Sequence, residues 1–177
     1  MWFLNVYIKE SGKLNSQNNV NTQFEALYDK YADMLYRLAL TNVQNSSDAE
    51  DIVHDVFIKW FEHQPDFKDE KHREGWFVKV TVNACHDFLR KKKHRTHDNI
   101  DDVHHIKSED KEENDIMHYL GLVPERYRNV LVLHYLEGYS VAEVSEMAGL
   151  SQSAVKMRLS RGREHLKNIM EGVEGND

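Results

Sequence analysis

The sequence is short of cysteine, proline and glycine. Its 177 residues contain one cysteine, two prolines and eight glycines. The single cysteine, Cys85, excludes an internal disulfide framework and a cysteine-rich zinc site, and it fits a reducing compartment such as the cytoplasm. Two prolines and eight glycines are also too few for the many tight turns of a β-sandwich or barrel, and for low-complexity chain. These shortages favour an all-α fold.

Long hydrophobic runs are missing as well. No stretch of the sequence approaches the roughly 18 apolar residues that a membrane helix needs. The apolar residues 1–8 have no basic segment before them and no small-residue cleavage site after them, so they do not resemble a secretory signal. The sequence therefore predicts a cytoplasmic protein with no membrane insertion.

Positive charge is in deficit overall but concentrated in two places. The chain has 23 Lys and Arg against 30 Asp and Glu, a net charge of −7, which argues against a protein that coats nucleic acid unaided. Residues 90–95 nevertheless hold five fixed cations in six positions, and residues 151–167 hold five cations against one acid. The location of charge therefore matters more for function than its total.

The first half of the chain shows the pattern of amphipathic helices. After a loose leader, residues 1–21, apolar residues recur at steps of three and four from Phe24, which predicts a long helix. A second helix is expected to begin at a capping box formed by Ser47 and Glu50. It should end where a charged connector, residues 65–74, begins with proline, because the residue before a proline avoids the helical conformation.

A third helix, predicted to begin near Gly75, carries two contrasting faces. The apolar face is expected to comprise Phe77, Val80, Thr81, Ala84 and Phe88. The opposite face, called here the polar stripe, comprises Lys79, Asn83, His86, Arg90 and Lys93. These side chains combine donors suited to phosphates with donors suited to base edges, which favours nucleic-acid contact over a merely solvated helix end. Trp76 is assigned to the core, with stacking on an unpaired base as the alternative.

An abrupt change of charge marks the middle of the chain. Residues 98–115 hold eight acids against two lysines and few large apolar residues. Such a composition predicts a flexible acidic linker, residues 96–115. The linker would join two small helical domains, residues 22–95 and 116–170, and a short tail, residues 171–177, would follow.

The second half contains the pattern of a helix-turn-helix. A helix is expected over residues 124–138. Ser140 and Glu143 form a capping box at the start of a short helix, Gly149 supplies a turn, and Ser151 is placed to cap the helix that follows. An ordinary helical hairpin would share this pattern. The basic outer face of the last helix favours one that enters the major groove of DNA.

Eleven histidines raise the question of a metal site. Carboxylate and imidazole stand three residues apart in Asp51 with His54, Asp101 with His104, and Asp115 with His118. A di-iron bundle instead needs Glu-x-x-His on two helices together with further inward glutamates. No phosphate-binding loop, nucleophile elbow or paired-cysteine motif is present either. We therefore predict no metal, no cofactor and no enzymatic activity.

Several of these segments together resemble a known family. Residues 47–60 and 75–93 resemble region 2 of bacterial RNA polymerase sigma factors of the extracytoplasmic-function type. Residues 123–131, 139–151 and 153–163 look like region 4 of the same family. Two independent motifs in the family's order make the resemblance specific.

The resemblance implies a function and places residues in it. It implies a sigma factor that binds core RNA polymerase and promoter DNA, directs transcription initiation, and is held by a cognate anti-sigma factor. The polar stripe would meet the melted minus-ten element. The implied polymerase-binding residues are Asp48, Asp51 and Asp55. The implied contacts to the minus-thirty-five element are Gln152, Ser153, Lys156, Arg158 and Arg161.

Two other classes of function remain as alternatives. A free-standing helix-turn-helix regulator would normally dimerise on duplex DNA, and no coiled-coil seam is evident here. A metal-dependent helical-bundle enzyme would carry stoichiometric metal after purification. Co-purification with core polymerase, followed by run-off transcription, separates the sigma factor from both.

Overall fold

The computed structural model describes residues 17–95 and 111–172. The chain divides into two compact units, residues 1–32 and 33–177, with the boundary inside the first described helix. Every regular element of the described residues is helical, which confirms the all-α prediction. The elements are α2 (Gln17–Val43), α3 (Ser46–His63), α4 (Glu70–Arg95), α5 (Lys111–Leu122), α6 (Glu125–Leu131), the π-helix η1 (Val132–Leu136), α7 (Val141–Ala148) and α8 (Gln152–Met170).

The first unit contains the beginning of α2. This helix begins at Gln17, inside the segment predicted as a loose leader, whose residues 1–16 lie outside the described chain. Extending an existing helix costs little because each added residue adds a backbone hydrogen bond, so a polar segment can continue it. Phe24 and Leu27 are buried as the periodicity predicted, and the Phe24 ring stacks on Tyr28 with centroids 5.8 Å apart.

The start of α3 differs from the prediction. Asn45, rather than Ser47, caps the helix, and its Oδ1 accepts a hydrogen bond from the amide of Asp48 over 2.9 Å. Ser47 lies within the first turn and is exposed. Asn and Ser cap helices about equally well, so sequence alone did not distinguish the two positions. The end of α3 at His63, just before the predicted connector, agrees with the prediction.

The start of α4 also lies earlier than predicted. The helix begins at Glu70 rather than near Gly75, so the second half of the predicted connector is helical. The carboxylate of Asp69 accepts the amide of His72 over 2.8 Å, and Arg73 forms an ion pair with Glu70 over 2.7 Å. Glu, Lys and Arg are good helix formers, and here a capping carboxylate and local ion pairs let charged residues form the first turn.

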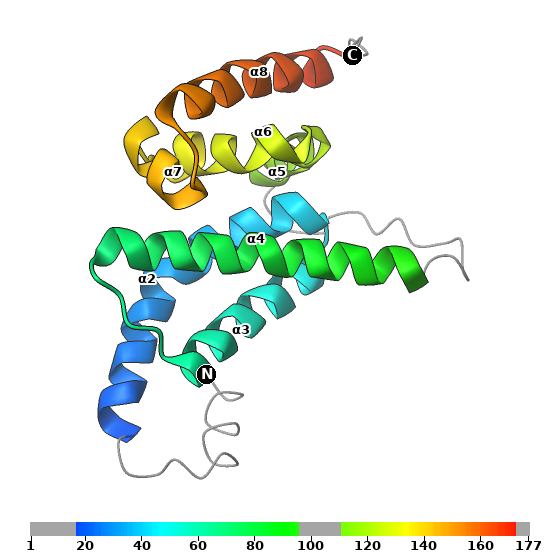
Figure 1. The fold of residues 1–177 in the computed structure, drawn as a ribbon. Coiled ribbons are helices and arrows are strands. Elements are labelled where there is room, and N and C mark those ends of the chain that lie inside the picture. The colour runs from blue at the N-terminus through cyan, green and yellow to red at the C-terminus, as the bar shows by residue number, and fades with distance from the viewer. Residues whose placement is uncertain (1–16, 96–110, 173–177) are drawn as a thin grey trace. The chain divides into compact units, whose positions relative to one another are not determined.

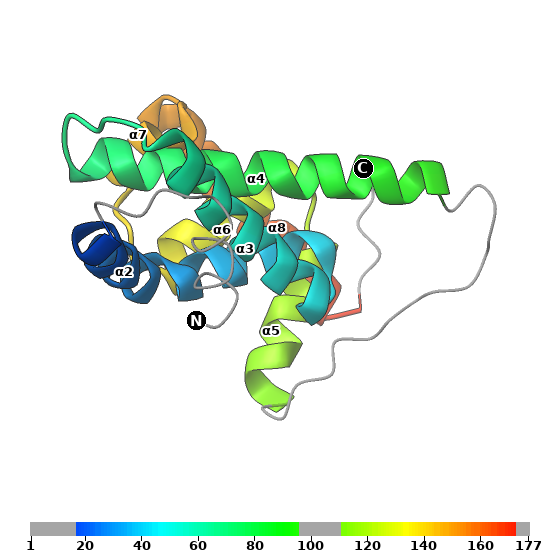
Figure 2. The same cartoon turned by 90° about the horizontal axis from the view of Figure 1, so that it is seen from below.

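α4 lies between α3 on one side and the helices of the second half on the other, with α7 against it (Figure 1; Figure 2). Its buried residues are Phe77, Val78, Thr81, Ala84 and Cys85. Val80 and Phe88, which the sequence placed in the core, are only half-buried. Val78 and Cys85 are buried in their place, so the buried face of α4 is turned away from the predicted stripe toward these two residues.

The helices of the second half pack closely on one another. α5 begins at Lys111, inside the predicted linker, while residues 96–110 lie outside the described chain. α8 packs along α6, α5 and α7 (Figure 1). Gly162 lets α8 approach α6 closely, because a Cβ there would lie 3.0 Å from the side chain of Leu131 and 3.1 Å from that of Tyr127.

The helix-turn-helix forms as predicted. Ser140 and Glu143 make the reciprocal capping box at the start of α7. Gly149 ends this helix with a φ of 63°, a conformation that favours glycine. Ser151 caps α8 by accepting the amide of Ala154 over 3.2 Å. Local sequence rules therefore set all three boundaries.

A π-helical segment separates α6 from this motif. In η1 the amide of Glu137 bonds the carbonyl of Val132 over 3.1 Å, five residues back rather than four. The sequence predicted one regular helix up to residues 137–138, and the chain does turn there, with Gly138 at a φ of 75°. The π-helical hydrogen bonding itself had no sequence signal.

Candidate nucleic-acid interface

The polar stripe of α4 is exposed along its whole length. The exposed residues are Lys79, Asn83, His86, Arg90 and Lys93. The reverse face of the same helix holds Phe77 and Thr81, both fully buried. The spacing of the sequence therefore brought the predicted residues to one exposed face, available for contact with a ligand.

Two members of the polar stripe bind carboxylates of the chain itself. Nε2 of His86 contacts Oε1 of Glu125, at the start of α6. Nη2 of Arg90 donates to Oδ1 of Asp87 over 2.9 Å, one turn earlier on α4. Both pairs are substantially exposed, so each contributes little to stability and a phosphate can displace its carboxylate.

The sequence left two roles open for Trp76, packing in the core and stacking on an unpaired base, and the structure places it between them. It is half-buried, with its ring edge-on to Phe67 and Phe77 at centroid distances of 5.8 Å and 5.1 Å. Part of its surface lines a cavity described below. The ring therefore packs on the core and keeps one accessible side.

The predicted contact residues of α8 do not all lie in the same environment. Gln152, Ser153, Lys156 and Arg161 are exposed. Val155 and Leu159 are buried on the other side of the helix. Arg158 is half-buried and lines the same cavity as Trp76, so the structure places it apart from the other four.

The acidic residues of α3 are divided as well. Asp51 and Asp55 are exposed, one turn apart, whereas Ile52 and Val56 on the other face are buried. Asp48 is half-buried, and its carboxylate accepts from Nζ of Lys92 on α4 over 3.4 Å. Asp48 therefore helps to join α3 to α4, while the other two present free carboxylate surface.

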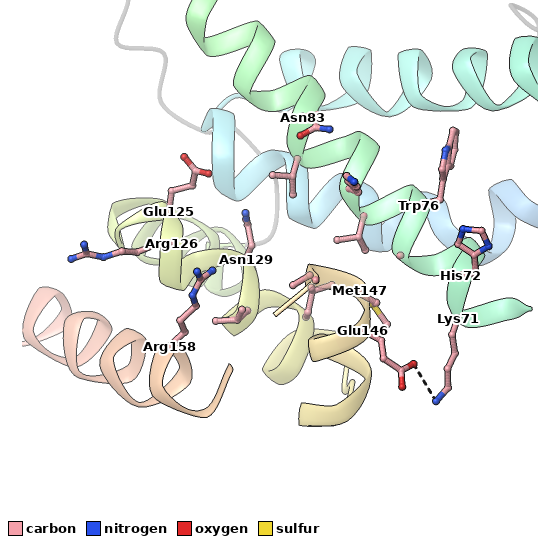
Figure 3. A pocket seen from close by; sticks show the side chains of 18 of the residues that line it. Lys71, His72, Trp76, Asn83, Glu125, Arg126, Asn129, Glu146, Met147 and Arg158 are labelled. Atoms are coloured by element: carbon pink, nitrogen blue, oxygen red, sulfur yellow. Dashed lines mark ion pairs between the residues drawn. The ribbon is translucent and has the colours of Figure 1, made fainter. Parts of the chain in front are cut away.

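A cavity of about 680 Å³ lies between α4 and the helices of the second half (Figure 3). Lys79 and Asn83 of the polar stripe line one side of it. Arg126 and Asn129 of α6 and Arg158 of α8 line another. Residues that the sequence assigned to two different DNA elements thus face one shared space.

Sequence patterns gave no sign of the polar contacts of Arg128. Arg128 is largely buried and donates to the carbonyls of Leu120, Gly121 and Val123, and to Oδ1 of Asn42 on α2. Burial lowers the pKa of Arg128 from its usual value, and the charge of Glu125 opposes that shift. Periodicity gives no signal for the contact with Asn42, because the two residues are 86 positions apart in the chain.

Two further titratable groups are governed by burial or capping. Burial raises the pKa of the Cys85 thiol to about 12, so the thiol is neutral at physiological pH. Hydrogen bonds from the hydroxyl and the amide of Ser140 lower the pKa of Glu143, which keeps the capping carboxylate ionised.

The described residues contain neither a clustered metal site nor a membrane-spanning helix. Among residues 17–95 and 111–172 no group of three or more potential metal ligands comes together. The pair Asp51 and His54 lies exposed on α3, and the pair Asp101 and His104 lies outside the described residues. None of the described helices is both long and apolar enough to cross a bilayer.

Comparison with known proteins decides the family. The Sigma-70 region 2 model matches residues 27–95, and the Sigma-70 region 4 model matches residues 113–166. The RNA polymerase sigma factor SigZ of Bacillus subtilis is 34% identical over 155 residues, covering 84% of this chain and 87% of SigZ. The ECF RNA polymerase sigma factor SigM of Mycobacterium tuberculosis is 26% identical over 150 residues, covering 83% of this chain and 76% of SigM.

The chain belongs to the extracytoplasmic-function sigma factors of RNA polymerase. It recognises promoters for the polymerase, and the alternative of a free-standing regulator is not favoured. Its fold is similar to that of the sigma factor RpoE of Bartonella quintana, solved in complex with the anti-sigma factor NepR. That similarity has a TM-score of 0.69 at 20% identity and covers 84% of this sigma factor and 97% of RpoE.

In this sigma factor the two matched regions correspond to parts of the fold already described. Region 2 comprises most of α2 together with α3 and α4, and region 4 comprises α5 to α8. The polar stripe and the acidic residues of α3 lie in region 2, and the helix-turn-helix lies in region 4. The family's members are transcription initiation factors.

Proposed function

We propose that each of three surfaces of this sigma factor has one partner. The polar stripe of α4 holds the unpaired strand of the minus-ten element, and α8 enters the duplex of the minus-thirty-five element. The exposed acids of α3 dock on the clamp helices of core polymerase. The observation that carries the proposal is the complete exposure of the polar stripe on a helix whose reverse face forms the core.

Within the polar stripe, Asn83 is the residue suited to a base. Its amide offers a donor and an acceptor, and its side chain is exposed beside the cavity (Figure 3). Arg90 and Lys93, closer to the end of α4, supply cations for phosphates. The stripe therefore combines one group that can select a base with several that hold the backbone.

On α8 the exposed side chains likewise include cations and groups suited to base edges. Lys156 and Arg161 point away from the buried Val155, on the side that enters a groove. Gln152 and Ser153 stand in the first turn, where a recognition helix meets base edges. Arg158 joins them only when it leaves the cavity beside α4.

Charge reversal tests the proposed polymerase contact of the exposed acids on α3. Asp51→Lys together with Asp55→Lys should weaken binding to core polymerase in a salt-matched titration while the helical content stays unchanged. The charge-matched control is Asp29→Lys with Asp33→Lys, both exposed on α2. Equal weakening by the control pair would show a nonspecific effect of charge, and unchanged affinity in the α3 pair would remove that surface from the proposal.

The similarity to RpoE suggests one more partner. Because RpoE was solved with an anti-sigma factor, we expect an anti-sigma factor to bind this chain as well. We also expect it to catalyse no reaction itself and to act in the cytoplasm, where core polymerase is found. Capture of a purified candidate anti-sigma factor, with loss of run-off transcription, tests the partner.

The Asn83→Ala variant tests the central part of the proposal. It should bind core polymerase normally, lose about tenfold or more of its transcription from a duplex promoter, and recover part of it when the minus-ten bubble is already open. Leu89→Ala, exposed on α4 but outside the polar stripe, is the matched control. Full activity of Asn83→Ala on the duplex would remove this residue as a promoter contact, and an equal loss on both templates would exclude a role in opening.

A further inference from the structure

The cavity beside α4 has the size of a small-molecule site. All of its lining residues belong to the second compact unit, residues 33–177. Its volume of about 680 Å³ falls within the range of roughly 300 to 1,000 Å³ that is usual for ligand pockets. Trp76, Val130, Leu133 and Met147 contribute apolar surface to it. The cavity can therefore hold an organic molecule of the size of a common metabolite.

The charges that line the cavity favour an anion. Each of the three acids among its lining residues already contacts another group of the chain: Glu125 with His86, Glu146 with Lys71, and Asp69 with the amide of His72. Lys79 and Arg158 also line the cavity, and neither forms an ion pair among residues 17–95 and 111–172. These cations are available to an anion that enters from outside.

Arg158 and Asn129 form one polar end of the cavity. Their side chains extend from α8 and α6 toward each other and toward α4 (Figure 3). Oδ1 of Asn129 accepts a hydrogen bond from Nδ2 of Asn42 over 2.9 Å, which orients the amide and leaves its own Nδ2 as a donor. A guanidinium beside an amide donor suits the oxygens of a phosphate, and the partial burial of Arg158 strengthens such a contact.

α4 supplies the other side of the cavity. Trp76, Lys79 and Asn83 follow one another at steps of three and four, so they lie on one face of the helix, and all three line the cavity. The accessible side of the Trp76 ring can stack on a nucleobase. The Asn83 amide can both donate to a base edge and accept from it, and Lys79 can pair with a phosphate.

We propose that this cavity is a binding site for a purine nucleoside diphosphate. The base stacks on Trp76 and bonds to Asn83, and the two phosphates meet Lys79, Asn129 and Arg158. A purine suits the site better than a pyrimidine because its larger ring system stacks more strongly. Cations on two separate helices suit two phosphates rather than one.

The nucleotide site stands apart from the proposed function, but one consequence rests on that function. Lys79, Asn83 and Arg158 are also the residues proposed to contact promoter DNA. A nucleotide that occupies these side chains therefore competes with DNA for them. Through this competition, the level of free nucleotide would set how much of the sigma factor can engage a promoter.

Isothermal titration of the full chain with GDP and with ADP tests the site. At least one of the two should bind with a Kd of about 100 µM or tighter. Inorganic pyrophosphate, which lacks the base and the ribose, should bind about tenfold more weakly or worse. Absence of binding by both nucleotides up to about 1 mM overturns the proposal. Equal affinity for pyrophosphate also overturns it, because the stacking surface would then contribute nothing.

Two arginines of α8 separate a built site from general attraction of anions. Arg158→Ala should weaken nucleotide binding about tenfold or more, because it removes charge-assisted hydrogen bonds to phosphate. Arg163→Ala is the matched control, since Arg163 is exposed on the same helix and does not line the cavity. It should change the affinity less than about twofold. Equal weakening by the two variants would show nonspecific binding of anions and overturn the proposal.

Two variants of α4 separate the base from the phosphates. Trp76→Leu should weaken binding of the nucleotide but not of pyrophosphate, since it removes the stacking surface. Lys79→Ala, at an exposed position where the fold is not at risk, should weaken both. Circular dichroism checks that Trp76→Leu keeps its helices. A chain with either substitution that binds nucleotide as tightly as the native chain contradicts the proposed orientation of the ligand.

Competition with DNA is measured on a labelled single strand that carries the minus-ten sequence. With nucleotide at about ten times its Kd, the apparent affinity of the full chain for the strand should fall about tenfold. If the nucleotide binds through Arg158 but leaves strand binding unchanged, the nucleotide site stands and the promoter roles of Lys79 and Asn83 are wrong. If no nucleotide binds while Asn83→Ala loses transcription, the nucleotide site is wrong and the proposed function stands.

Discussion

The two cation-bearing helices, α4 and α8, differ in how the chain itself uses their cations. On α4, His86 contacts Glu125 and Arg90 pairs with Asp87. On α8, the exposed Lys156 and Arg161 meet no carboxylate among the contacts of the described residues. The chain's own carboxylates therefore contact two residues of the polar stripe, whereas Lys156 and Arg161 of α8 stand open and only Lys167, near the end of α8, pairs with a carboxylate, that of Glu171. Because both pairs on α4 are exposed, a phosphate can displace their carboxylates at little cost.

The anchoring of α4 in the core gives the largest expected effect. Phe77 is fully buried, with ring centroids 5.4 Å from Phe57 and 5.1 Å from Trp76. Phe77→Ala should lower the free energy of unfolding by about 3 to 5 kcal/mol, since it leaves a cavity between α3 and α4. Urea denaturation followed by circular dichroism measures this. A loss below about 1 kcal/mol would show that α4 does not depend on this core.

The anchoring of α8 is expected to be less sensitive. Gly162→Ala places a methyl group 3.0 Å from the side chain of Leu131, which can move only partly. Overpacking of this kind costs about 1 to 3 kcal/mol. Binding to a minus-thirty-five duplex should fall while the affinity for core polymerase through α3 stays unchanged. A parallel loss of both affinities would contradict the separation of α8 from the polymerase surface.

Two variants of α8 sharpen the contrast between base and phosphate contacts. Arg161→Ala should cost about 1 to 3 kcal/mol at one promoter position and relax the preference there. Lys156→Ala should weaken all sequences alike and reduce the slope of log affinity against log salt by about 1. Duplex titrations at several salt concentrations, on a promoter and on single-base variants, distinguish them. Identical profiles for the two variants would show that neither residue selects a base.

The cap of α8 gives the smallest expected effect. Ser151→Ala removes the hydroxyl that accepts the amide of Ala154 and should cost about 0.5 to 2 kcal/mol of stability. Ser160→Ala, exposed in the middle of the same helix, is the control and should change stability far less. Thermal denaturation of the two variants compares them directly, and equal midpoints would show that the cap is dispensable.

Features set by local sequence were predicted well. The capping box of Ser140 and Glu143, the positive φ of Gly149 and the exposed polar stripe all depend on neighbours within one or two helical turns. The predictions of the capping residue of α3 and of the first turn of α4 were wrong, because several nearby residues satisfy the same local rule. Asn45 and Ser47 are two such competitors.

Features set by distant partners were not predictable from periodicity. Arg37 and Glu137 are 100 residues apart, and His86 and Glu125 are 39 apart. Periodicity identifies which side of a helix is apolar, but it carries no information on which helix covers that side. The roles of individual DNA-contacting and polymerase-contacting residues stay predictions for the same reason, since their partners lie outside the chain.

The π-helical turn at Val132–Leu136 makes the contacts of the residues after it depend on the length of the chain as well as on its residues. One extra residue in a helix turns everything after it by about 100°. Deletion of a single residue there would restore a regular α-helix, and Glu137 and Tyr139 would then face away from Arg37 and Met34, which they now contact. A single-codon deletion in this turn would therefore remove two contacts between α2 and the segment after η1, without changing any residue of the polar stripe.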